Sequence, residues 1–411
     1  MRVAIHTYGT RGDVQPFVAF ALALRSAGHD VQLAGPVQYA SLAKDREIAY
    51  VALPGDLVAL IDTPEGKAAI EGGEGFAAGL RLLKNIRPLI EGLLLAEWEA
   101  ARDFRPDAIV YHPKSLAALH IAEQLGSIPI LAAPLPVLTP TSAFPSPILP
   151  FRSLGPLNRL SHRAVAWGSQ RLFARTVSKW RHQHLSLLPD SPQTLRPKAT
   201  LYSYSRHIIP IPADWDKDVH VTGPWFLERP DWAMPSTLQD FIAGGSAPVY
   251  VGFGSMPAMS SGTLTEAIVG ALRLTGRRGL LLSGGGAISP SLQDPDLYVL
   301  QDAPHDRILP FAHSALHHGG AGTTMASAKA GIPCAICPFF GDQPFWARRM
   351  YDLGVSPPPL SRKRITTDAI AGAIDAMDAP LLRDRAASLG EQVRQEEGLK
   401  SAVALLERYC L

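Results

Sequence analysis

VAIHTYGTRGDVQPFVAFALALRSAGHDVQLA, residues 3–34, is the segment from which the architecture can be inferred. Residues 3–5 form a short apolar strand, and a turn-rich segment follows it. From Val14 to Ala27 the apolar side chains recur at helical spacing, Gly28 supplies a stop, and residues 31–34 read as a second strand. Strand, helix and strand in this order predict a βαβ unit and a parallel sheet.

The same alternation returns along the chain and divides it into two series. The first series continues with a strand at 107–111, a helix at 116–124 and a strand at 129–132. The second series has strands at 248–255, 279–283, 297–300, 315–317 and 334–337. We therefore expect two α/β domains. The connector between them, about residues 210–245, is rich in proline and is typical of an ordered linker.

Composition excludes several classes of protein. The chain has 411 residues, of which 46% are hydrophobic, so it can form more than one core. A net charge of +2 excludes a globally polybasic nucleic-acid binder, and three cysteines exclude a disulfide scaffold and fit a reducing compartment. The first residues lack the layout of a signal peptide, and no apolar run is long enough to cross a membrane. We expect a soluble cytoplasmic protein that binds no nucleic acid.

One segment differs in charge composition from the rest of the chain. Residues 124–189 contain no aspartate or glutamate. Within them, residues 151–181 interleave arginines and a lysine with large apolar side chains. This pattern is typical of a solvated helical face that covers a substrate cleft. It also fits a basic amphipathic segment in peripheral contact with an anionic membrane, at the inner face of the cell membrane.

The most specific segment is HHGGAGTT, residues 317–324. It follows an apolar strand and precedes a helix that we expect from Met325 to Ala330. Such a junction presents backbone N–H groups and the positive end of a helix dipole, which together suit a phosphate. A glycine-rich structural turn is the alternative. The two histidines at the strand end favour an anion site.

A second motif, PFFGDQPFW, spans residues 338–346. A carboxylate beside an amide supplies acceptors and donors for the neighbouring hydroxyl groups of a sugar. Asp342 can also serve as the N-cap of a helix that includes Pro344, and both roles are compatible.

Together these motifs resemble the donor-site signature of family 1 glycosyltransferases of the GT-B fold. The resemblance is strongest to the branch of sterol 3-beta-glucosyltransferases and bacterial antibiotic or lipid glycosyltransferases. Further matches are GTRGDVQP at 9–16, Thr139-Pro140-Thr141 with Phe144-Pro145, FGSM at 253–256 and Pro304-His305-Asp306, so that nearly the whole chain is covered.

The resemblance implies an α/β architecture in which two Rossmann-like parallel-sheet domains face each other across a cleft. Residues 1–228 would bind the acceptor and residues 229–388 the nucleotide sugar. A C-terminal helix, 389–411, would pack back across both domains. The activity implied is an inverting transfer of a hexose, from UDP-glucose or a dTDP-sugar, to a sterol, terpenoid, lipid or polyketide.

The resemblance also assigns roles to single residues. His318 and the amides of the glycine-rich turn would bind the donor diphosphate, and Asp342 and Gln343 would hold sugar hydroxyls. Relatives place a tryptophan near the position of Asp302 or of Arg307, and this chain has neither, so the base-side pocket departs from the pattern. The expected donor-binding set is Arg11, Gly12, Gly254, Ser255, Ser283, Ala303, His318, Gly320, Ala321, Gly322, Thr323, Asp342 and Gln343.

Asp13 is the candidate catalytic base. It stands where many relatives carry a histidine, and transfer needs a base that takes the proton of the acceptor hydroxyl. The alternative is that Asp13 only caps a helix that starts at Val14. The acceptor would meet Thr10, His112, Thr139 and Phe144, with a structural role for His112 as the alternative.

Other chemistries find little support. Cys334 and Cys337 form a C-x-x-C motif inside an apolar strand, which favours buried thiols over a zinc or redox site. The histidines lack a metal-ligand spacing, so we expect neither a metal nor another cofactor. Two further functions stay open, a sugar-nucleotide epimerase of similar fold and a non-catalytic nucleotide-sugar binding protein.

Overall fold

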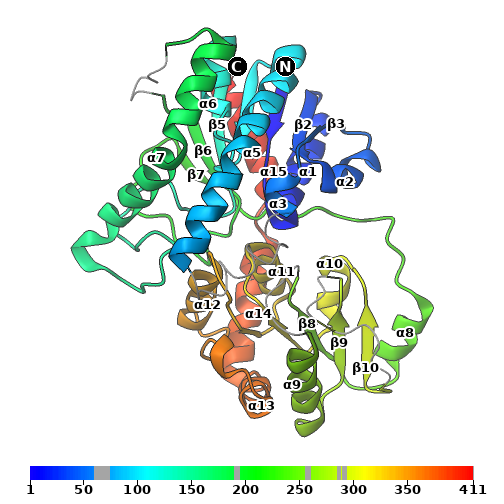
Figure 1. Ribbon diagram of the computed structural model, residues 1–411. Helices are drawn as coiled ribbons and strands as arrows, with labels where there is room; N and C mark the ends of the chain where they lie inside the picture. Colours follow the sequence, from blue (N-terminus) through cyan, green and yellow to red (C-terminus); the bar gives the residue numbers. More distant parts are fainter. Residues whose placement is uncertain (60–74, 189–194, 255–260, 285–287, 289–293, 411) are drawn as a thin grey trace.

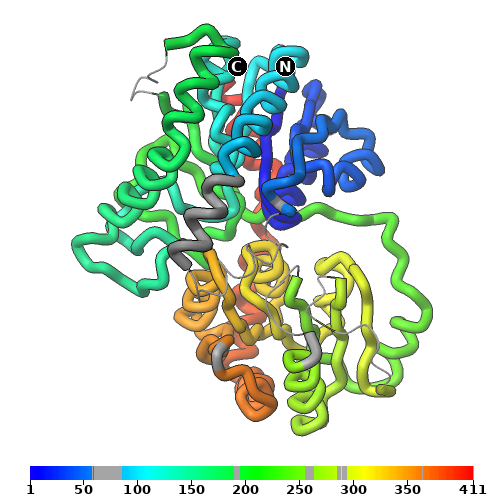
Figure 2. The backbone as a smooth tube through the Cα atoms, viewed as in Figure 1, coloured from blue at the N-terminus to red at the C-terminus, as the bar shows by residue number. Residues whose placement is uncertain are grey.

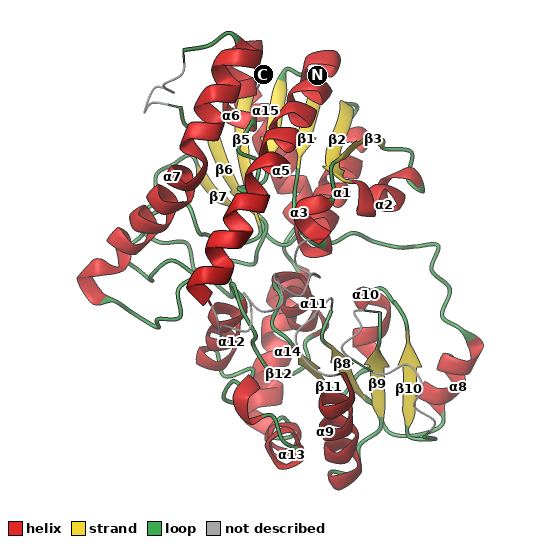
Figure 3. Cartoon of the chain, viewed as in Figure 1, coloured by secondary structure: helices red, strands yellow, loops and turns green. Residues whose placement is uncertain are grey.

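The computed structural model describes residues 1–59, 75–188, 195–254, 261–284, 288 and 294–410. Two α/β domains lie one above the other in Figure 1, with both chain termini on the upper, N-terminal domain. Each domain has a parallel sheet covered by helices, as Figure 3 shows. The structure confirms the expected fold class of two parallel-sheet α/β domains.

The N-terminal domain is built on a seven-stranded sheet of order β3-β2-β1-β4-β5-β6-β7. The central strands β1 and β4 are buried, because helices cover both faces of the sheet. The strands are β1 (Arg2–His6), β2 (Asp30–Pro36), β3 (Ala49–Leu53), β4 (Ala108–Tyr111), β5 (Ile128–Ala133), β6 (Ala199–Tyr202) and β7 (Val219–Val221). The helices are α1 (Arg11–Ser26), η1 (Val37–Tyr39), α2 (Ala40–Lys44), α3 (Asp56–Ala59), α5 (Gly75–Phe104), α6 (Ala118–Leu125), η3 (Gly155–Leu157) and α7 (Asn158–Leu185).

The C-terminal domain carries a five-stranded sheet of order β10-β9-β8-β11-β12. Its strands are β8 (Val249–Gly252), β9 (Gly279–Leu282), β10 (Leu297–Leu300), β11 (Ser314–His317) and β12 (Cys334–Ile336). Its helices are α8 (Ser236–Ala243), α9 (Ser261–Leu274), α10 (His305–Ile308), η4 (Leu309–Phe311), α11 (Ala321–Ala330), α12 (Gln343–Asp352), η5 (Arg362–Arg364), α13 (Thr367–Ala376) and α14 (Pro380–Arg394).

The chain crosses between the domains twice, as Figure 2 shows. After α14 it returns to the N-terminal domain as α15 (Gly398–Cys410), whose Ala402, Val403 and Leu406 join the core beside α1. The single returning helix expected from residue 389 is therefore two helices. The break at 395–397, rather than residue 389, is where the chain passes from one domain to the other.

Three local expectations are wrong. The expected linker at 210–245 contains β7, which extends the first sheet, and α8. The first helix begins at Arg11 and not at Val14, and the helix expected from Met325 begins at Ala321. In both helices the first turn is polar or glycine-rich, so apolar periodicity appears only after the helix has started.

The acid-free segment becomes a long surface helix. Most of residues 151–181 lie in α7, and residues 167–172 are all exposed. Within the described residues, no helix combines the length and the apolar character needed to cross a bilayer.

Candidate functional site

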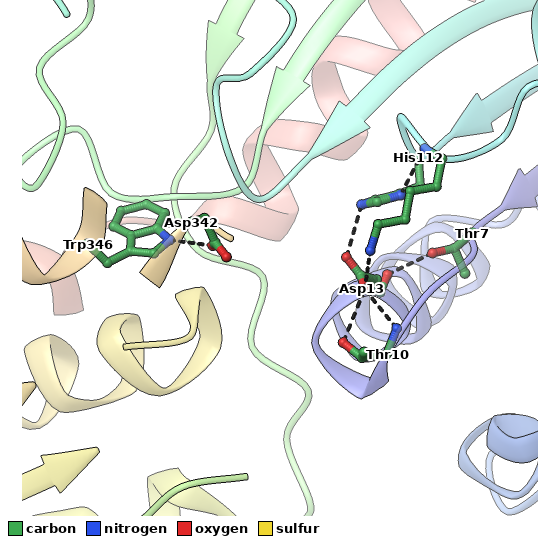
Figure 4. A network of polar contacts seen from close by, with 7 residues as sticks. Thr7, Thr10, Asp13, His112, Asp342 and Trp346 are labelled. Atoms are coloured by element: carbon green, nitrogen blue, oxygen red, sulfur yellow. Dashed lines mark hydrogen bonds and ion pairs between the residues drawn. The ribbon is translucent and has the colours of Figure 1, made fainter. Parts of the chain in front are cut away.

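The first half of the site lies where the strand order of the N-terminal sheet reverses, at the carboxyl ends of β1 and β4. Such switch points are where open α/β sheets bind ligands. The loop after β1 leads to Asp13 on α1, and the loop after β4 carries His112 and Lys114. Figure 4 shows Asp13 surrounded by Thr10, His112 and Thr7.

Asp13 is held by bonds to one of its two carboxylate oxygens. Its Oδ2 accepts from the Thr10 backbone N–H at 2.7 Å, the Thr10 hydroxyl at 3.1 Å and Lys114 Nζ at 2.8 Å. The bond to the Thr10 N–H belongs to a capping box, in which Thr10 is the N-cap and Asp13 the third helical residue. The prediction that Asp13 is itself the N-cap is therefore wrong.

The loop before α1 leaves room for this carboxylate only because residue 9 is a glycine. Gly9 has a φ of +134°, and a Cβ atom there would lie 2.2 Å from Asp13 Oδ2. Any other residue would displace the carboxylate and strain the backbone.

The surroundings keep Asp13 ionised. Burial by itself would raise the pKa of Asp13. The electrostatic interactions with Lys114 and His112, together with the hydrogen bonds from Lys114 and Thr10, outweigh burial, so the pKa lies below its usual value. The side chain is 17% exposed, so an incoming hydroxyl group can reach it.

His112 presents a donor to the other oxygen of this carboxylate. Its Nδ1 accepts the Lys114 backbone N–H at 3.2 Å, so the ring hydrogen is on Nε2, which lies 3.4 Å from Asp13 Oδ1. Burial lowers the pKa of His112 to about 4, although the charge of Asp13 opposes this shift. In this arrangement the lone pair of Nδ1 is occupied and Nε2 offers a donor to the carboxylate.

Asp13 Oδ1 is consequently the atom suited to accept a proton. Its Oδ2 already accepts from three donors, whereas within the described residues only His112 approaches Oδ1. The long 3.4 Å separation leaves lone-pair capacity for a substrate hydroxyl group.

A buried polar cluster braces the loop behind these residues. Glu97 of α5 accepts from His6 Nδ1 at 2.9 Å and from the hydroxyl of Ser115, which in turn accepts the N–H of Ala118 at the start of α6. His6 and Glu97 are both 1% exposed. The cluster fixes the 112–115 loop from beneath.

The second half of the site is the start of α11 in the C-terminal domain. The helix begins at Ala321, so that the N–H groups of Ala321, Gly322 and Thr323 are in its first turn, where anions bind. His318 lies beside this turn, and a Cβ atom on Gly320 would be 2.6 Å from its Nε2. The structure therefore brings His318 and Gly320 to Thr323 together around one helix end.

The histidine ring is oriented by the backbone of β8. His318 Nδ1 lies 3.4 Å from the carbonyl oxygen of Gly252, a group that only accepts, so Nδ1 carries a hydrogen. Burial lowers the pKa of His318. Gly254, with a φ of +56°, borders the other side of the ring, whereas Ser255 lies outside the described residues. His317 is buried, and its Nδ1 accepts the N–H of Gly319 at 3.0 Å, a structural role.

Asp342 and Gln343 lie at the start of α12. Asp342 occupies the N-cap position, but its carboxylate accepts from Trp346 Nε1 at 2.8 Å and does not cap the helix. Burial raises the pKa of Asp342, and the charge of Asp13 acts in the same direction. Gln343 is 6% exposed, and its Oε1 accepts the N–H of Phe339 at 2.7 Å, so its side chain shapes the loop. Figure 4 shows Asp342 across from Asp13.

Arg11, expected at the donor, bridges the two domains in this structure. Its guanidinium donates to both carboxylate oxygens of Asp302 after β10, at 3.1 and 3.3 Å, and Arg229 reaches the same carboxylate at 3.2 Å. Neighbouring Gly12 is exposed on α1. Ala303 is buried beside Asp302, and Ser283 donates to the carbonyl oxygen of Leu300 at 3.2 Å, which ties β9 to β10.

The two remaining acceptor candidates lie on the segment after β5. The Thr139 hydroxyl is 2.6 Å from the Tyr202 hydroxyl. Phe144 packs against Phe345 of α12, with ring centroids 5.7 Å apart, and so meets the other domain. They are not part of the cluster around Asp13 that contains Thr10 and His112.

Sequence reasoning missed Lys114, Glu97 and Asp302 as partners of the site. Lys114 follows a strand end by three residues, which is a weak signal, and Glu97 has none because it lies within a long helix. Cys334 and Cys337 are buried, and burial raises the pKa of both thiols to about 12. Among the described residues no group of three or more metal-ligating side chains converges.

An N-terminal and a C-terminal segment of the chain each match a known protein family. Residues 3–145 match the glycosyltransferase family 28 N-terminal domain, and residues 295–399 match the erythromycin biosynthesis protein CIII-like C-terminal domain.

Two characterised relatives match from end to end. A sterol 3-beta-glucosyltransferase of Arabidopsis thaliana is 33% identical over 426 residues, which cover 100% of this chain and 68% of the plant protein. The O-mycaminosyltylonolide 6-deoxyallosyltransferase of Streptomyces fradiae is 32% identical over 422 residues, covering 100% of this chain and 97% of that protein. The chain spans only 28% of a fungal sterol 3-beta-glucosyltransferase from Glomerella lagenarium.

The fold has counterparts among solved structures. The glycotransferase of kitacinnamycin superposes with a TM-score of 0.72 at 20% identity, and the match covers 100% of this chain and 99% of that one.

Proposed function

The chain belongs to the GT-B glycosyltransferases that include sterol 3-beta-glucosyltransferases and bacterial antibiotic glycosyltransferases, and we propose that it transfers a hexose to a hydroxyl group of a hydrophobic acceptor. The observation that carries the proposal is the pair formed by Asp13 and the start of α11. A partly exposed carboxylate lies on one domain, and a glycine-rich helix start suited to an anion lies on the other.

The chemical step is an in-line displacement. The acceptor hydroxyl gives its proton to Asp13 Oδ1 while its oxygen forms a bond to the anomeric carbon of the donor. The bond from that carbon to the diphosphate oxygen breaks, and its electron pair leaves with the nucleoside diphosphate. Attack opposite the leaving group inverts the anomeric configuration. A positioned base of this kind contributes about 10²–10⁴-fold.

The leaving diphosphate is stabilised by the N–H groups that open α11 and by His318. These groups supply positive potential to the developing charge, and we propose that the reaction proceeds with no metal ion or other cofactor. Asp342, whose pKa is raised, would form hydrogen bonds with hydroxyl groups of the sugar at the start of α12.

We propose UDP-glucose as donor, with a dTDP-sugar as the second choice, and a sterol, terpenoid, lipid or polyketide as acceptor. The support is the sterol 3-beta-glucosyltransferase from Arabidopsis thaliana and the deoxyallosyltransferase from Streptomyces fradiae, both similar over this whole chain.

A donor-by-acceptor screen followed by mass spectrometry tests the activity. A transferase forms product only when an acceptor is present, whereas an epimerase changes the sugar nucleotide alone and a binding protein changes neither. The Asp13→Asn variant should lose at least about 10²-fold in kcat while it binds UDP as the native protein does. Turnover at the native rate in that variant would remove Asp13 as the base.

We further propose peripheral contact with the cytoplasmic face of a membrane through residues 151–181. Trp167 is 64% exposed on α7, and Phe151, Leu157, Leu160 and Leu172 are also exposed beside Arg163, Arg171 and Arg175. Apolar side chains that enter the lipid, flanked by arginines that attract anionic headgroups, form an interfacial helix.

Vesicle co-sedimentation tests this contact. The protein should bind phosphatidylglycerol vesicles at low salt and dissociate from them at high salt. It should not bind vesicles of phosphatidylcholine. Trp167→Ala with Leu160→Ala should weaken binding, and Leu274→Ala, an equally exposed leucine of the C-terminal domain, should not. Failure to bind anionic vesicles at low salt would exclude the membrane.

A further inference from the structure

The segment after β5 that we call the acceptor loop, residues 134–146, contains no helix or strand. It holds Thr139 and Phe144, which are expected to meet the acceptor, and Phe144 also contacts Phe345 of the other domain. Because the loop belongs to no helix or sheet, its shape depends on groups outside the loop that form hydrogen bonds with its backbone.

The first turns of α7 supply those groups. Asn158, Ser161 and His162, which we call the α7 clamp, stand at i, i+3 and i+4 and therefore share one face of the helix. They are 4%, 7% and 0% exposed, although Arg159, Leu160 and Arg163 around them are exposed. Three buried polar side chains in an exposed stretch of helix need partners, and the acceptor loop provides them.

Two members of the clamp hold the end of the loop. Asn158 Nδ2 donates to the carbonyl oxygen of Ser142 at 2.9 Å. The Ser146 N–H donates to Ser161 Oγ at 2.8 Å, and that hydroxyl donates back to the Asn158 carbonyl oxygen at 2.6 Å. The loop end and the start of α7 thus form one hydrogen-bonded unit.

The third member, His162, joins the two sides of the loop. Its Nδ1 lies 3.0 Å from the carbonyl oxygen of Val137, and its Nε2 lies 3.0 Å from that of Phe144. Carbonyl oxygens only accept, so each of these contacts is a hydrogen bond when the ring nitrogen in it carries hydrogen. The ring spans the base of the turn that presents Thr139 and Phe144, and it lies tilted by 58° against the Phe144 ring with centroids 5.9 Å apart.

The tip of the loop is held from a second side. Asp214 accepts from the Thr141 hydroxyl at 2.7 Å and from the Ser142 N–H at 2.8 Å. Arg159 of α7 approaches the same carboxylate at 3.7 Å. The loop is therefore fixed between α7 and Asp214, and the ring of Phe144 is left to meet the C-terminal domain.

We propose that the α7 clamp, with His162 at its centre, is a positioning device that sets acceptor affinity and selectivity through the shape of the acceptor loop. The inference rests on the proposed function for the identity of the ligand, whereas the clamp itself rests on the hydrogen bonds above. His162 does not touch the reacting atoms and acts through Phe144 and Thr139.

Kinetics with several acceptors test the proposal on the full chain. His162→Phe keeps a ring but removes the two ring nitrogens that face the carbonyl oxygens, and we expect its acceptor KM to rise about tenfold or more and its preference among acceptors to change. UDP affinity by calorimetry should stay within about twofold of native. His162→Gln, which keeps one donor, should recover part of the loss. Gln170→Ala, exposed on the same helix, is the matched control.

Hydrogen exchange gives a readout that does not depend on activity. Amides of residues 141–144 and 146 should exchange faster in His162→Phe and in Asn158→Ala, and those of β5 should not. If His162→Phe does not fold, Asn158→Ala and His162→Gln carry the same comparison. Native acceptor kinetics together with native exchange in these variants would overturn the proposal. Altered exchange in a chain that glycosylates no acceptor would refute the function and leave the clamp standing.

Discussion

Lys114 contacts both Asp13 and His112: its Nζ donates to Asp13 Oδ2 at 2.8 Å, and its backbone N–H donates to His112 Nδ1 at 3.2 Å. One residue therefore holds Asp13 ionised and keeps the hydrogen of His112 on Nε2. Oδ2 of Asp13 is thus occupied, whereas within the described residues Oδ1 faces only the His112 donor.

Removal of the lysine charge should shift the pH profile. Lys114 contributes to the lowered pKa of Asp13, so in Lys114→Met that pKa rises. Because Asp13 acts only when ionised, the acidic limb of kcat/KM should move to higher pH. Rate measurements from pH 4 to 8 test this, with Lys217→Met, exposed before β7, as control.

The same pair affects stability. A lowered folded-state pKa stabilises the protein above the unfolded value of 3.8, and this contribution is lost as the pH falls through the folded-state pKa. Lys114→Met should lose less stability between neutral and acidic pH than the native chain. An unchanged acidic limb and an unchanged acid titration would contradict the pairing.

Substitution of His112 distinguishes an orienting donor from a base. His112→Gln retains a donor near Asp13 but cannot act as a base at neutral pH. We expect its kcat within about tenfold of native, whereas Asp13→Asn loses about 10²-fold or more. Equal, complete loss in both variants would identify His112 as the base.

A methyl group at residue 320 should impair the donor site. Gly320 has an ordinary φ of −62°, so alanine is allowed by the backbone, but its Cβ would lie 2.6 Å from His318 Nε2. The ring must then move away from the start of α11. Calorimetry should show UDP affinity reduced about tenfold or more in Gly320→Ala. Gly372→Ala on α13, where a Cβ meets nothing within 4 Å, should leave affinity unchanged.

Nucleotide binding should take up a proton. Nδ1 of His318 faces the carbonyl oxygen of Gly252, so Nε2 can donate to a phosphate only after the ring is protonated. Burial lowers the pKa of His318 in the unbound protein, and a bound diphosphate raises it. UDP affinity should therefore decrease as pH rises between these two pKa values. Calorimetry in buffers of different ionisation enthalpy measures the proton, and His318→Gln should abolish its uptake.

The bridge between the domains engages Arg11, a residue expected to bind the donor. Asp302 neutralises Arg11 and Arg229, and both partners in the Arg11 pair are more than a third exposed, so its own stabilisation is small. Asp302→Asn should leave the melting temperature nearly unchanged and tighten UDP binding severalfold, because two guanidinium groups are released. Asp240→Asn, exposed on α8, is the control. Weaker UDP binding in Asp302→Asn would instead assign the carboxylate to the nucleotide.

Much of the fold can be predicted from residues 3–34 and the later strands, because buried parallel strands are continuous apolar runs. Helix starts were predicted less well. The first turns at Arg11 and Ala321 carry polar or glycine residues, and the helices there are set by a capping box and by packing. Strand β7 was missed because three residues that join a sheet edge have no periodicity to detect.

Some residues of the candidate site could also be predicted from the sequence, and others could not. Asp13, His318 and the glycine-rich turn lie in local motifs, and the structure places each at a strand or helix end as expected. Arg11 and Gln343 were expected at the donor, but their side chains are engaged with Asp302 and with the Phe339 backbone.

The amino-acid sequence by itself determined the two parallel-sheet domains, the glycine-rich turn before α11 and the position of Asp13, because each depends on residues that are neighbours in the chain. The tertiary structure decided which oxygen of Asp13 has fewer donors and how the acceptor loop is held. Lys114 lies 101 residues from Asp13, and Asp302 lies 291 residues from Arg11. Charge and hydrogen-bond geometry act through space, so the ionisation of Asp13 and the restraint of Arg11 arise only when folding brings distant segments within 3 to 4 Å.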